Sequence, residues 1–136
     1  MNRIICIGNR YVESDALGAR VFDILSRREL PADVELFDGG LAGLNLLPLM
    51  DDCERVVFVD AIAGDDDGVQ ILDADEVAGA SVYGHAGGLG YLLGAHRALG
   101  GRTGVGLWVV GTGATESALA VAEAALSIAL GEEICQ

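Results

Sequence analysis

The chain has 136 residues, of which 51% are hydrophobic, and a net charge of −13, so it is long enough for one domain with its own core. This charge argues against a nucleic-acid partner, because phosphate contacts need clustered cations and the eight basic residues here are scattered. No apolar run reaches the roughly 18 residues of a membrane span, and the N-terminus lacks the pattern of a signal peptide. We therefore expect a cytoplasmic, monomeric, single-domain protein over residues 1–136 that binds neither nucleic acid nor membrane.

Apolar runs and helical spacing predict an alternation of strands and helices along the chain. Strands are expected at 3–7, 34–37, 55–60, 69–72 and 105–110, where short apolar runs are bounded by turn residues. Helices are expected from Asp15 to about Arg28, and at 43–50, 89–99 and 116–130. In the helix at 43–50, Leu44, Leu47 and Met50 are expected on one side. This order predicts an α/β fold, a three-layer α/β/α sandwich with a twisted and mostly parallel sheet.

The stretch from Ile4 to Phe22 first raises the question of phosphate binding, because a buried strand passes through Gly8 towards a helix. A phosphate-binding turn, however, requires GxxxxGK(S/T) or GxGxxG. Here a single glycine is followed by Glu13 and Asp15, whose charges would repel a phosphate at the helix N-terminus. The sequence therefore disfavours a nucleotide site in this stretch.

Two carboxylates and one imidazole follow separate predicted strands. Asp15 comes after the first strand, Asp60 ends the third, and His85 stands in the glycine-rich segment after the fourth. Because ligands gather outside the carboxyl ends of parallel strands, these side chains can converge there on a divalent metal such as zinc, nickel or iron. An ordinary structural role is also open to each residue: Asp15 as a helix N-cap, Asp60 bonded to loop amides, and His85 as a common loop histidine.

Nucleophilic catalysis has less support than a metal site. His96 lies eleven residues after His85, about 16 Å along a helix, so we expect it in a surface or groove position and not as a second ligand. Cys6 is expected to be buried, and Cys53 precedes the third strand at the end opposite Asp60. No CxxC spacing or GxSxG elbow is present, and no recognisable motif supports Ser14, Ser81 or Ser117 as a nucleophile.

Four short motifs occur in a fixed order, and together they suggest a family. They are GN-x5-D-x-x-G (Gly8 to Gly18), DGG-x-x-G (Asp38 to Gly43), VDA (Val59 to Ala61) and H-x3-LG (His85 to Gly90). In this order and spacing, between about Ile4 and Leu99, the chain resembles the [NiFe]-hydrogenase maturation endopeptidases. The resemblance implies a twisted five-stranded sheet flanked by helices, of the phosphorylase/hydrolase-like type, formed by one hydrogenase maturation protease-like domain.

The resemblance also implies an activity and a set of residues. Family members act as aspartic-type endopeptidases that remove a C-terminal extension from the precursor of the hydrogenase large subunit, once nickel has been inserted. The family's metal-contacting positions, which carry catalysis, match Asp15, Asp60 and His85. The nickel is carried by the precursor, zinc or cadmium can occupy the site in vitro, and no organic cofactor is implied. Asp38, Gly39 and Gly40 are expected to position the substrate backbone, and a role of Asp38 as a turn former is equally open.

A second hypothesis remains open beside proteolysis. The segment Thr112–Thr115, after the fifth predicted strand, is shorter than the corresponding loop in many family members. A non-proteolytic accessory protein of the same fold, which binds a hydrogenase subunit without cutting it, would also fit the sequence.

Overall fold

The computed structural model describes residues 2–41, 43–51, 53–61, 68–73, 89–99, 106–111 and 117–132, and within them five strands form one sheet. The order across the sheet is β2-β1-β3-β5-β4. β1 pairs in parallel with β2 and β3, β3 pairs in parallel with β5, and the edge strand β4 runs antiparallel to β5. The predicted mostly parallel sheet is confirmed, with strands β1 (Asn2–Ile7), β2 (Val34–Gly40), β3 (Arg55–Val59), β4 (Gln70–Asp73) and β5 (Gly106–Gly111).

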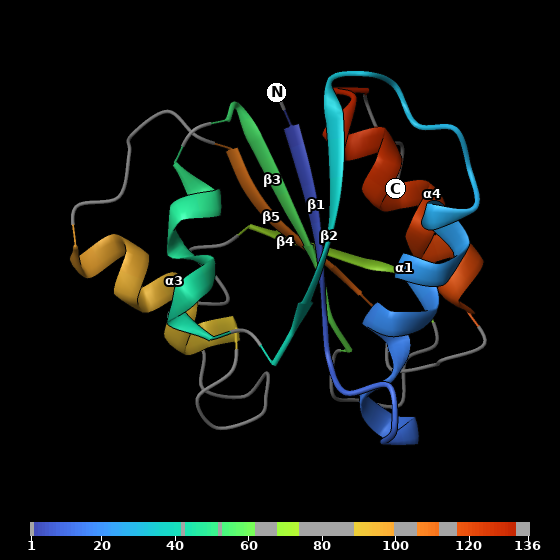
Figure 1. Cartoon of the computed structure of the whole chain (residues 1–136), viewed down its shortest axis with the longest axis horizontal. Coiled ribbons are helices and arrows are strands. Elements are labelled where there is room, and N and C mark those ends of the chain that lie inside the picture. Colours follow the sequence, from blue (N-terminus) through green and yellow to red (C-terminus); the bar gives the residue numbers. More distant parts are fainter. Residues whose placement is uncertain are drawn as a thin grey trace.

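Helices cover both faces of this sheet, as Figure 1 shows. α1 (Leu17–Ser26) and α4 (Ala118–Ala129) pack together on one face. α3 (Leu89–Ala98) and the 3-10 helix η2 (Leu44–Met50) lie on the other. A short 3-10 helix, η1 (Glu13–Asp15), joins β1 to α1. The three-layer α/β/α architecture predicted from the sequence is therefore confirmed.

The core has two halves because the side chains of β1 alternate between the two faces of the sheet. Ile4 and Cys6 pack against α1 and α4, whereas Ile5 and Ile7 pack against η2 and α3. All four side chains are at most 4% exposed. A strand buried on both faces reads as a continuous apolar run, which is why this strand was visible in the sequence. Each fully buried Ile contributes roughly 1.5–3 kcal/mol.

β2 extends further than its apolar residues predicted. The strand was expected to end before Asp38, but it continues to Gly40. Cys6 lies opposite Asp38 but Ile7 lies opposite Gly40, so the register shifts and Gly39 is the extra residue. This irregularity lets the chain continue pairing with β1 while it bends towards the carboxyl edge of the sheet.

η2 descends from the surface into the core. Leu44, at its start, is 45% exposed, whereas Leu46 is buried and Met50, at its end, is fully buried. Of the three side chains expected on one side of this helix, Met50 is fully buried, Leu47 is partly buried against the same core, and Leu44 is exposed.

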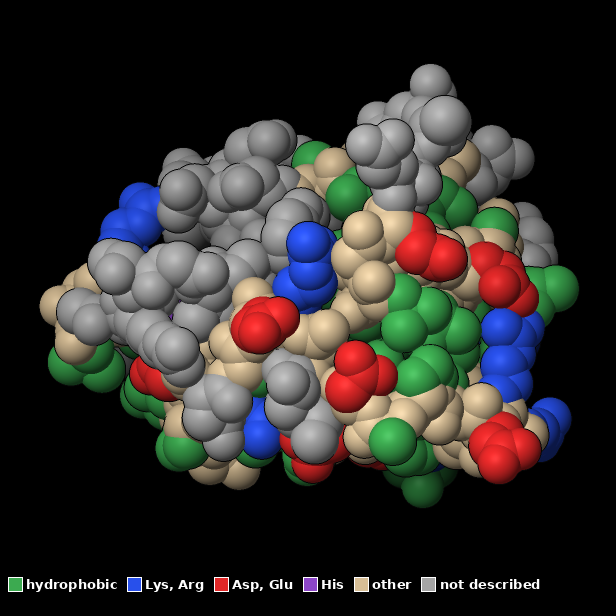
Figure 2. Space-filling model, turned by 90° about the horizontal axis from the view of Figure 1, so that it is seen from above, with side chains coloured by type: hydrophobic (Ala, Val, Ile, Leu, Met, Phe, Trp, Pro, Cys, Tyr) green, Lys and Arg blue, Asp and Glu red, His purple; other side chains and the backbone are tan. Residues whose placement is uncertain are grey.

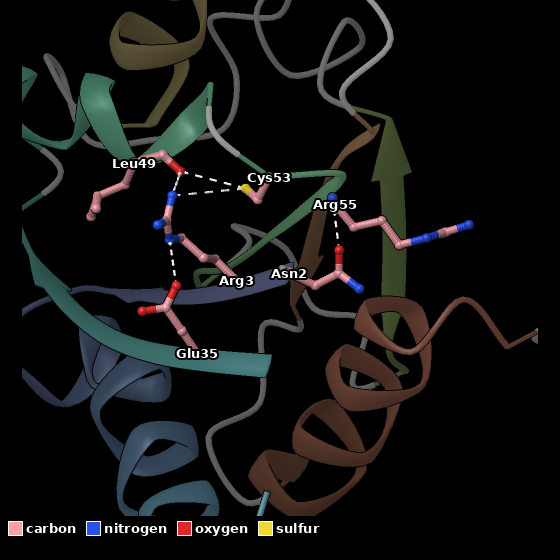
Figure 3. Close-up of polar contacts among 6 residues, drawn as sticks. All are labelled: Asn2, Arg3, Glu35, Leu49, Cys53 and Arg55. Atoms are coloured by element: carbon pink, nitrogen blue, oxygen red, sulfur yellow. Dashed lines mark hydrogen bonds and ion pairs between the residues drawn. The ribbon is translucent and has the colours of Figure 1, made fainter. Parts of the chain in front are cut away.

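A buried arginine joins several segments at the amino end of the sheet (Figure 3). Arg3 in β1 is 8% exposed, and its Nε donates to Oε1 of Glu35 at 3.2 Å. Its Nη1 donates to the carbonyl oxygen of Leu49 at 2.9 Å and lies 3.9 Å from Sγ of Cys53. Charge-assisted hydrogen bonds of this kind offset the cost of burying the guanidinium. Cys53 lies beside Arg3 at the amino end, opposite the end at which β3 leads to Asp60, as predicted.

The neighbouring Asn2 connects the first strand to the last helix. Its Nδ2 donates to the carbonyl oxygen of Ala129 at 2.7 Å, and its Oδ1 accepts from the backbone N–H of Arg55 at 3.1 Å. Figure 3 shows the second of these bonds, between β1 and β3. One side chain thus fixes the amino end of β1 against both β3 and the last turn of α4.

The surface carries its charge in dispersed form. Figure 2 views the end of the molecule at which β1 begins, and there acidic side chains stand among apolar and neutral ones with basic side chains between them. Such interspersed charge is typical of solvated surface. Over the stretches that the structure describes, no helix has both the length and the apolar character needed to cross a bilayer.

Candidate functional site

The strand order creates a switch point between β1 and β3. From β1 the chain moves to β2 on one side of the sheet, and then returns to add β3 on the other side. In open α/β sheets, ligands bind outside the carboxyl ends of the strands at such a point. Asp60 follows β3 directly and lies level with Ile7, since Cys6 pairs with Val59. Asp60 thus stands at the end of β3, and Asp15 is tied to the end of the adjacent strand β1 by the amide of Asn9, two residues after that strand.

Asp15 is held in place by the turn that leaves β1. Its side chain is buried, and Oδ2 accepts a hydrogen bond of 3.0 Å from the backbone N–H of Asn9. Gly8 has a φ of 134°, and a Cβ at this position would lie 2.3 Å from the carbonyl oxygen of Asp15. Only glycine accommodates both this backbone conformation and this close approach. The GN-x5-D motif therefore encodes a turn in which the amide of Asn9 binds the carboxylate of Asp15.

The alternative that Asp15 caps the following helix is wrong. The N-cap of α1 is Ala16, which makes no side-chain capping bond. The Asp15 carboxylate instead reaches back to Asn9, because η1 places it beside the end of β1. The Asp15 carboxylate is thus tied to the turn that leaves β1.

Asp60 is also buried, at 8% exposure. Its Oδ1 accepts from the backbone N–H of Ala61 at 2.9 Å, so the expected bond to a loop amide is present. Such a bond occupies one oxygen of the carboxylate and orients the other, so it is compatible with metal ligation. Burying a carboxylate is costly unless hydrogen bonds or a cation compensate for the lost hydration. Carboxylate oxygens with an imidazole are a donor set for a divalent transition metal.

The predicted third ligand lies outside the described residues. His85 belongs to the segment 74–88, four residues before α3 begins at Leu89. Within the described part of the chain, no three His, Cys, Asp or Glu side chains form a metal-binding group. The three-residue site therefore stays a prediction, and so does the role of the short segment Thr112–Thr115, which also lies outside the described residues.

His96 is buried, which corrects the expected surface or groove position. It is 7% exposed, and its Nε2 lies 2.7 Å from Oδ1 of Asp51. Asp51 follows η2 and supplies the polar partner that makes burial of an imidazole in α3 tolerable. The pair joins α3 to η2 and so fixes the helix that begins just after His85. Sequence reasoning missed it because the two residues are 45 positions apart.

The DGG motif contributes to a cleft next to the turn that holds Asp15. Asp38 is exposed, and its Oδ1 accepts from the backbone N–H of Gly40 at 3.2 Å, as expected of a turn-forming aspartate. Gly40 accepts in turn from the backbone N–H of Gly8 at 2.7 Å, which ties the ends of β1 and β2 together. Gly39 packs inwards, since a Cβ there would lie 2.8 Å from Cγ2 of Ile5.

The cleft itself has a volume of about 330 Å³ and opens between the segments that follow β1 and β2. Asp38 and Gly40 line it, and their role in positioning the substrate stays a prediction. Sequence reasoning missed its other principal members, Tyr11 and Leu41, because exposed apolar residues in loops carry no pattern. The lining residues are Gly8, Asn9, Arg10, Tyr11, Ala19, Asp38, Gly40 and Leu41.

Charges around the cleft help to raise the pKa of the Arg10 guanidinium and of the Cys6 thiol. Arg10 donates two hydrogen bonds to the carboxylate of Asp23, with N–O distances of 3.3 and 3.4 Å. These bonds and the charge of Asp23 raise the pKa of the Arg10 guanidinium, and the charge of Asp38 raises it further. Burial, assisted by the charges of Asp38 and Asp23, raises the pKa of the Cys6 thiol far above its usual range. A thiol that stays protonated is a poor nucleophile, so Cys6 is a core residue, as predicted.

Solved structures with the same fold are hydrogenase maturation endopeptidases. The hydrogenase maturating endopeptidase HybD from Escherichia coli superimposes with a TM-score of 0.71 and 28% identity, covering 96% of this chain and 90% of that one. The [NiFe] hydrogenase maturation protease HycI from Thermococcus kodakarensis KOD1 has a TM-score of 0.72, with 95% and 92% coverage. At 23% identity, the second structure supports the fold alone. The class of protein is therefore an α/β/α domain with the fold of these endopeptidases.

The sequence comparisons give the family. The model of the hydrogenase maturation protease family matches residues 19–125, so this chain belongs to that family. Hydrogenase 2 maturation protease from Escherichia coli K12 is 37% identical over 60 residues, and HupD, a hydrogenase expression/formation protein from Rhodobacter capsulatus, is 35% identical over 60. Each match covers 43% of this chain, but only 37% and 29% of these relatives. The match to the family model includes Asp38, Asp60 and His85 and begins four residues after Asp15.

Proposed function

We propose that this protein is an endopeptidase that removes the C-terminal extension from a [NiFe]-hydrogenase large-subunit precursor after nickel insertion. Membership of the hydrogenase maturation protease family supports the substrate class. The observation that carries the proposal is the placement of two buried carboxylates, Asp15 and Asp60, at the ends of adjacent parallel strands at the switch point of the sheet.

In this proposal the metal arrives with the substrate. Asp15, Asp60 and His85 bind the nickel of the precursor, and the scissile peptide is thereby held next to these side chains. The bond from the Asn9 amide fixes the Asp15 carboxylate before substrate arrives, which lowers the cost of ordering it on binding. Asp38 and Gly40 at the neighbouring cleft position the peptide backbone.

Two mechanisms fit this arrangement. In one, the nickel polarises the scissile carbonyl or lowers the pKa of an attacking water. In the other, the nickel serves as a recognition element, and a neighbouring carboxylate removes a proton from the water as a general base. Replacing nickel by zinc in the precursor distinguishes them, because a Lewis-acid role changes kcat with the metal, whereas a recognition role changes chiefly the apparent KM.

The test is cleavage of nickel-loaded and nickel-free precursor by wild-type and variant protein. Asp15→Asn, Asp60→Asn and His85→Ala are each expected to slow removal of the tail by about a hundredfold or more, because each removes a metal ligand. Asp33→Asn is the matched control, since Asp33 is exposed in the turn before β2, at the opposite end of the sheet. Normal cleavage by Asp15→Asn, or equal cleavage of nickel-free precursor, would contradict the proposal.

The accessory-protein hypothesis predicts a different result in the same assay. The protein would then bind the subunit stably while the tail stays attached, in the wild type as in the variants. The short segment Thr112–Thr115 is the feature that favours it. We further propose a cytoplasmic monomer without nucleic-acid or membrane partners, for which light scattering after size-exclusion chromatography tests the oligomeric state.

A further inference from the structure

Exposed apolar side chains gather at the carboxyl edge of the sheet. In the described part of the chain, seven large hydrophobic side chains are exposed, and four of them belong to the segments that follow β1 and β2. These four are Tyr11 at 89%, Val12 at 45%, Leu41 at 73% and Leu44 at 45%. Single exposed apolar residues are ordinary, but a gathering at one edge marks an interaction site.

The cleft between these two segments has the size and lining of a side-chain pocket. Tyr11 and Leu41 contribute its apolar walls, and Gly8 and Gly40 line it without side chains of their own. Its volume of about 330 Å³ lies at the small end of the range of about 300–1,000 Å³ for ligand sites. That space suits one side chain with its adjoining backbone better than a folded element of a partner.

The charge around the cleft selects among candidate side chains. Asp38 lines it, and Arg10 is paired with Asp23, so the Arg10 charge is largely compensated. Glu13 lines an adjacent hollow that shares Arg10 and Tyr11 with the cleft. A basic residue near the entering side chain is therefore attracted, and an acidic one is repelled.

We propose that this cleft is a specificity pocket that recognises an aliphatic side chain in an extended, basic segment of the substrate next to the cleavage site. The proposal rests on the proposed function, because it assigns the pocket to the same substrate, and Asn9, which lines the pocket, also holds the Asp15 carboxylate. Tyr11 and Leu41 are its specificity-determining residues. Their exposure in the free protein is explained by the substrate that covers them.

The test begins with peptide binding, followed by NMR amide shifts of ¹⁵N-labelled protein. The probes are Ac-Gly-Lys-Leu-Lys-Gly-NH₂, the same peptide with Ser in place of Leu, and Ac-Gly-Glu-Leu-Glu-Gly-NH₂. We expect the first peptide to shift the amides of Tyr11 and Leu41, with a Kd about tenfold lower than for either of the others. Tyr11→Ser and Leu41→Ser are expected to weaken its binding about fivefold.

Two further variants make the test specific. Leu99→Ser is the matched control, because Leu99 is 75% exposed, close to the 73% of Leu41, but lies at the end of α3. It should bind the first peptide as wild type does. Gly40→Asn fills the pocket without disturbing the core, since a Cβ at Gly40 meets nothing within 4 Å and Asn tolerates the φ of 57°. Its binding of the first peptide should fall at least fivefold.

Cleavage kinetics separate the pocket from the proposed function. With nickel-loaded precursor, Leu41→Ser should raise KM about fivefold and leave kcat within twofold, whereas Asp15→Asn lowers kcat. Equal binding of the Leu and Ser peptides, or wild-type binding by Gly40→Asn, would overturn the pocket whether or not the tail is cut. If the Leu peptide binds as expected but no precursor is processed, the pocket stands and the proposed function fails.

Discussion

Two glycines within helices predict stability changes of opposite sign when each is replaced by alanine. Gly18 lies in the first turn of α1, and a Cβ there would be 2.1 Å from the carbonyl oxygen of Ile7 and 2.8 Å from its N and C atoms. Ile7 is backbone of the central strand and is paired on the β2 side, so it has little freedom to retreat. Gly94 lies within α3, where a Cβ meets nothing within 4 Å.

The magnitudes follow from these contacts. Alanine in place of glycine gains about 1 kcal/mol of helix propensity at either position. At Gly18 the helix must also move about 1 Å away from β1 to relieve the contact with the oxygen, and overpacking against backbone costs about 3 kcal/mol, the upper end of the usual range. We expect Gly18→Ala to lose about 2 kcal/mol of unfolding free energy, and Gly94→Ala to gain about 0.5–1 kcal/mol.

Urea unfolding, followed by circular dichroism at 25 °C, measures both changes. With a typical m-value of about 2 kcal/mol/M, Gly18→Ala should lower the midpoint by about 1 M, and Gly94→Ala should raise it by up to about 0.5 M, with m unchanged. Gly94→Ala thus serves as the internal control for helix propensity. A Gly18→Ala variant as stable as wild type would refute the close approach of α1 to β1, and with it the way Asp15 is placed.

Three other changes test separate parts of the structure. Gly8→Ala should lose at least about 2 kcal/mol in thermal unfolding, because φ is 134° and the new Cβ would lie 2.3 Å from the Asp15 carbonyl oxygen; unchanged stability would contradict it. Arg3→Met should lose about 2–4 kcal/mol of unfolding free energy in urea, since the charge-assisted bonds to Glu35 and Leu49 disappear; Arg3→Lys should retain part of this stability, and equal losses would argue against a geometric role. Cys6 should react with iodoacetamide at pH 8 about a hundredfold more slowly in native than in unfolded protein, because burial raises the pKa of its thiol and keeps it from solvent. Mass spectrometry of the tryptic peptide that contains Cys6 measures the two rates. Similar rates would show that β1 opens readily.

The central strands were predictable because both of their faces are buried. Ile4 to Ile7 and Val56 to Val59 are continuous apolar runs, and such runs leave little choice of structure. The order of strands and the antiparallel direction of β4 were not predictable in the same way, because a strand's own residues do not specify its neighbours. The extension of β2 through Gly39 was missed because pairing with β1 outweighs the low strand propensity of glycine.

The candidate site was predictable as far as topology fixes it. Asp15 and Asp60 were expected after the first and third strands, and they lie at the ends of two adjacent parallel strands. The partners of these carboxylates were not predictable: the amide that holds Asp15 belongs to a turn whose shape depends on the positive φ of Gly8. The burial of His96 was missed for a related reason, because its partner belongs to another layer of the fold.

The contact between the first strand and the last helix has a consequence for synthesis of the chain. Ile4 and Cys6 are covered by residues of α4, including Val121 and Ala125, and Asn2 bonds to Ala129 near its end. A nascent chain that has not yet released α4 from the ribosome therefore has one face of its central strands exposed to water. Because that face supplies much of the core, we expect the domain to fold after translation of α4 and not progressively. Chains that stall before α4 should depend on chaperones and be degraded.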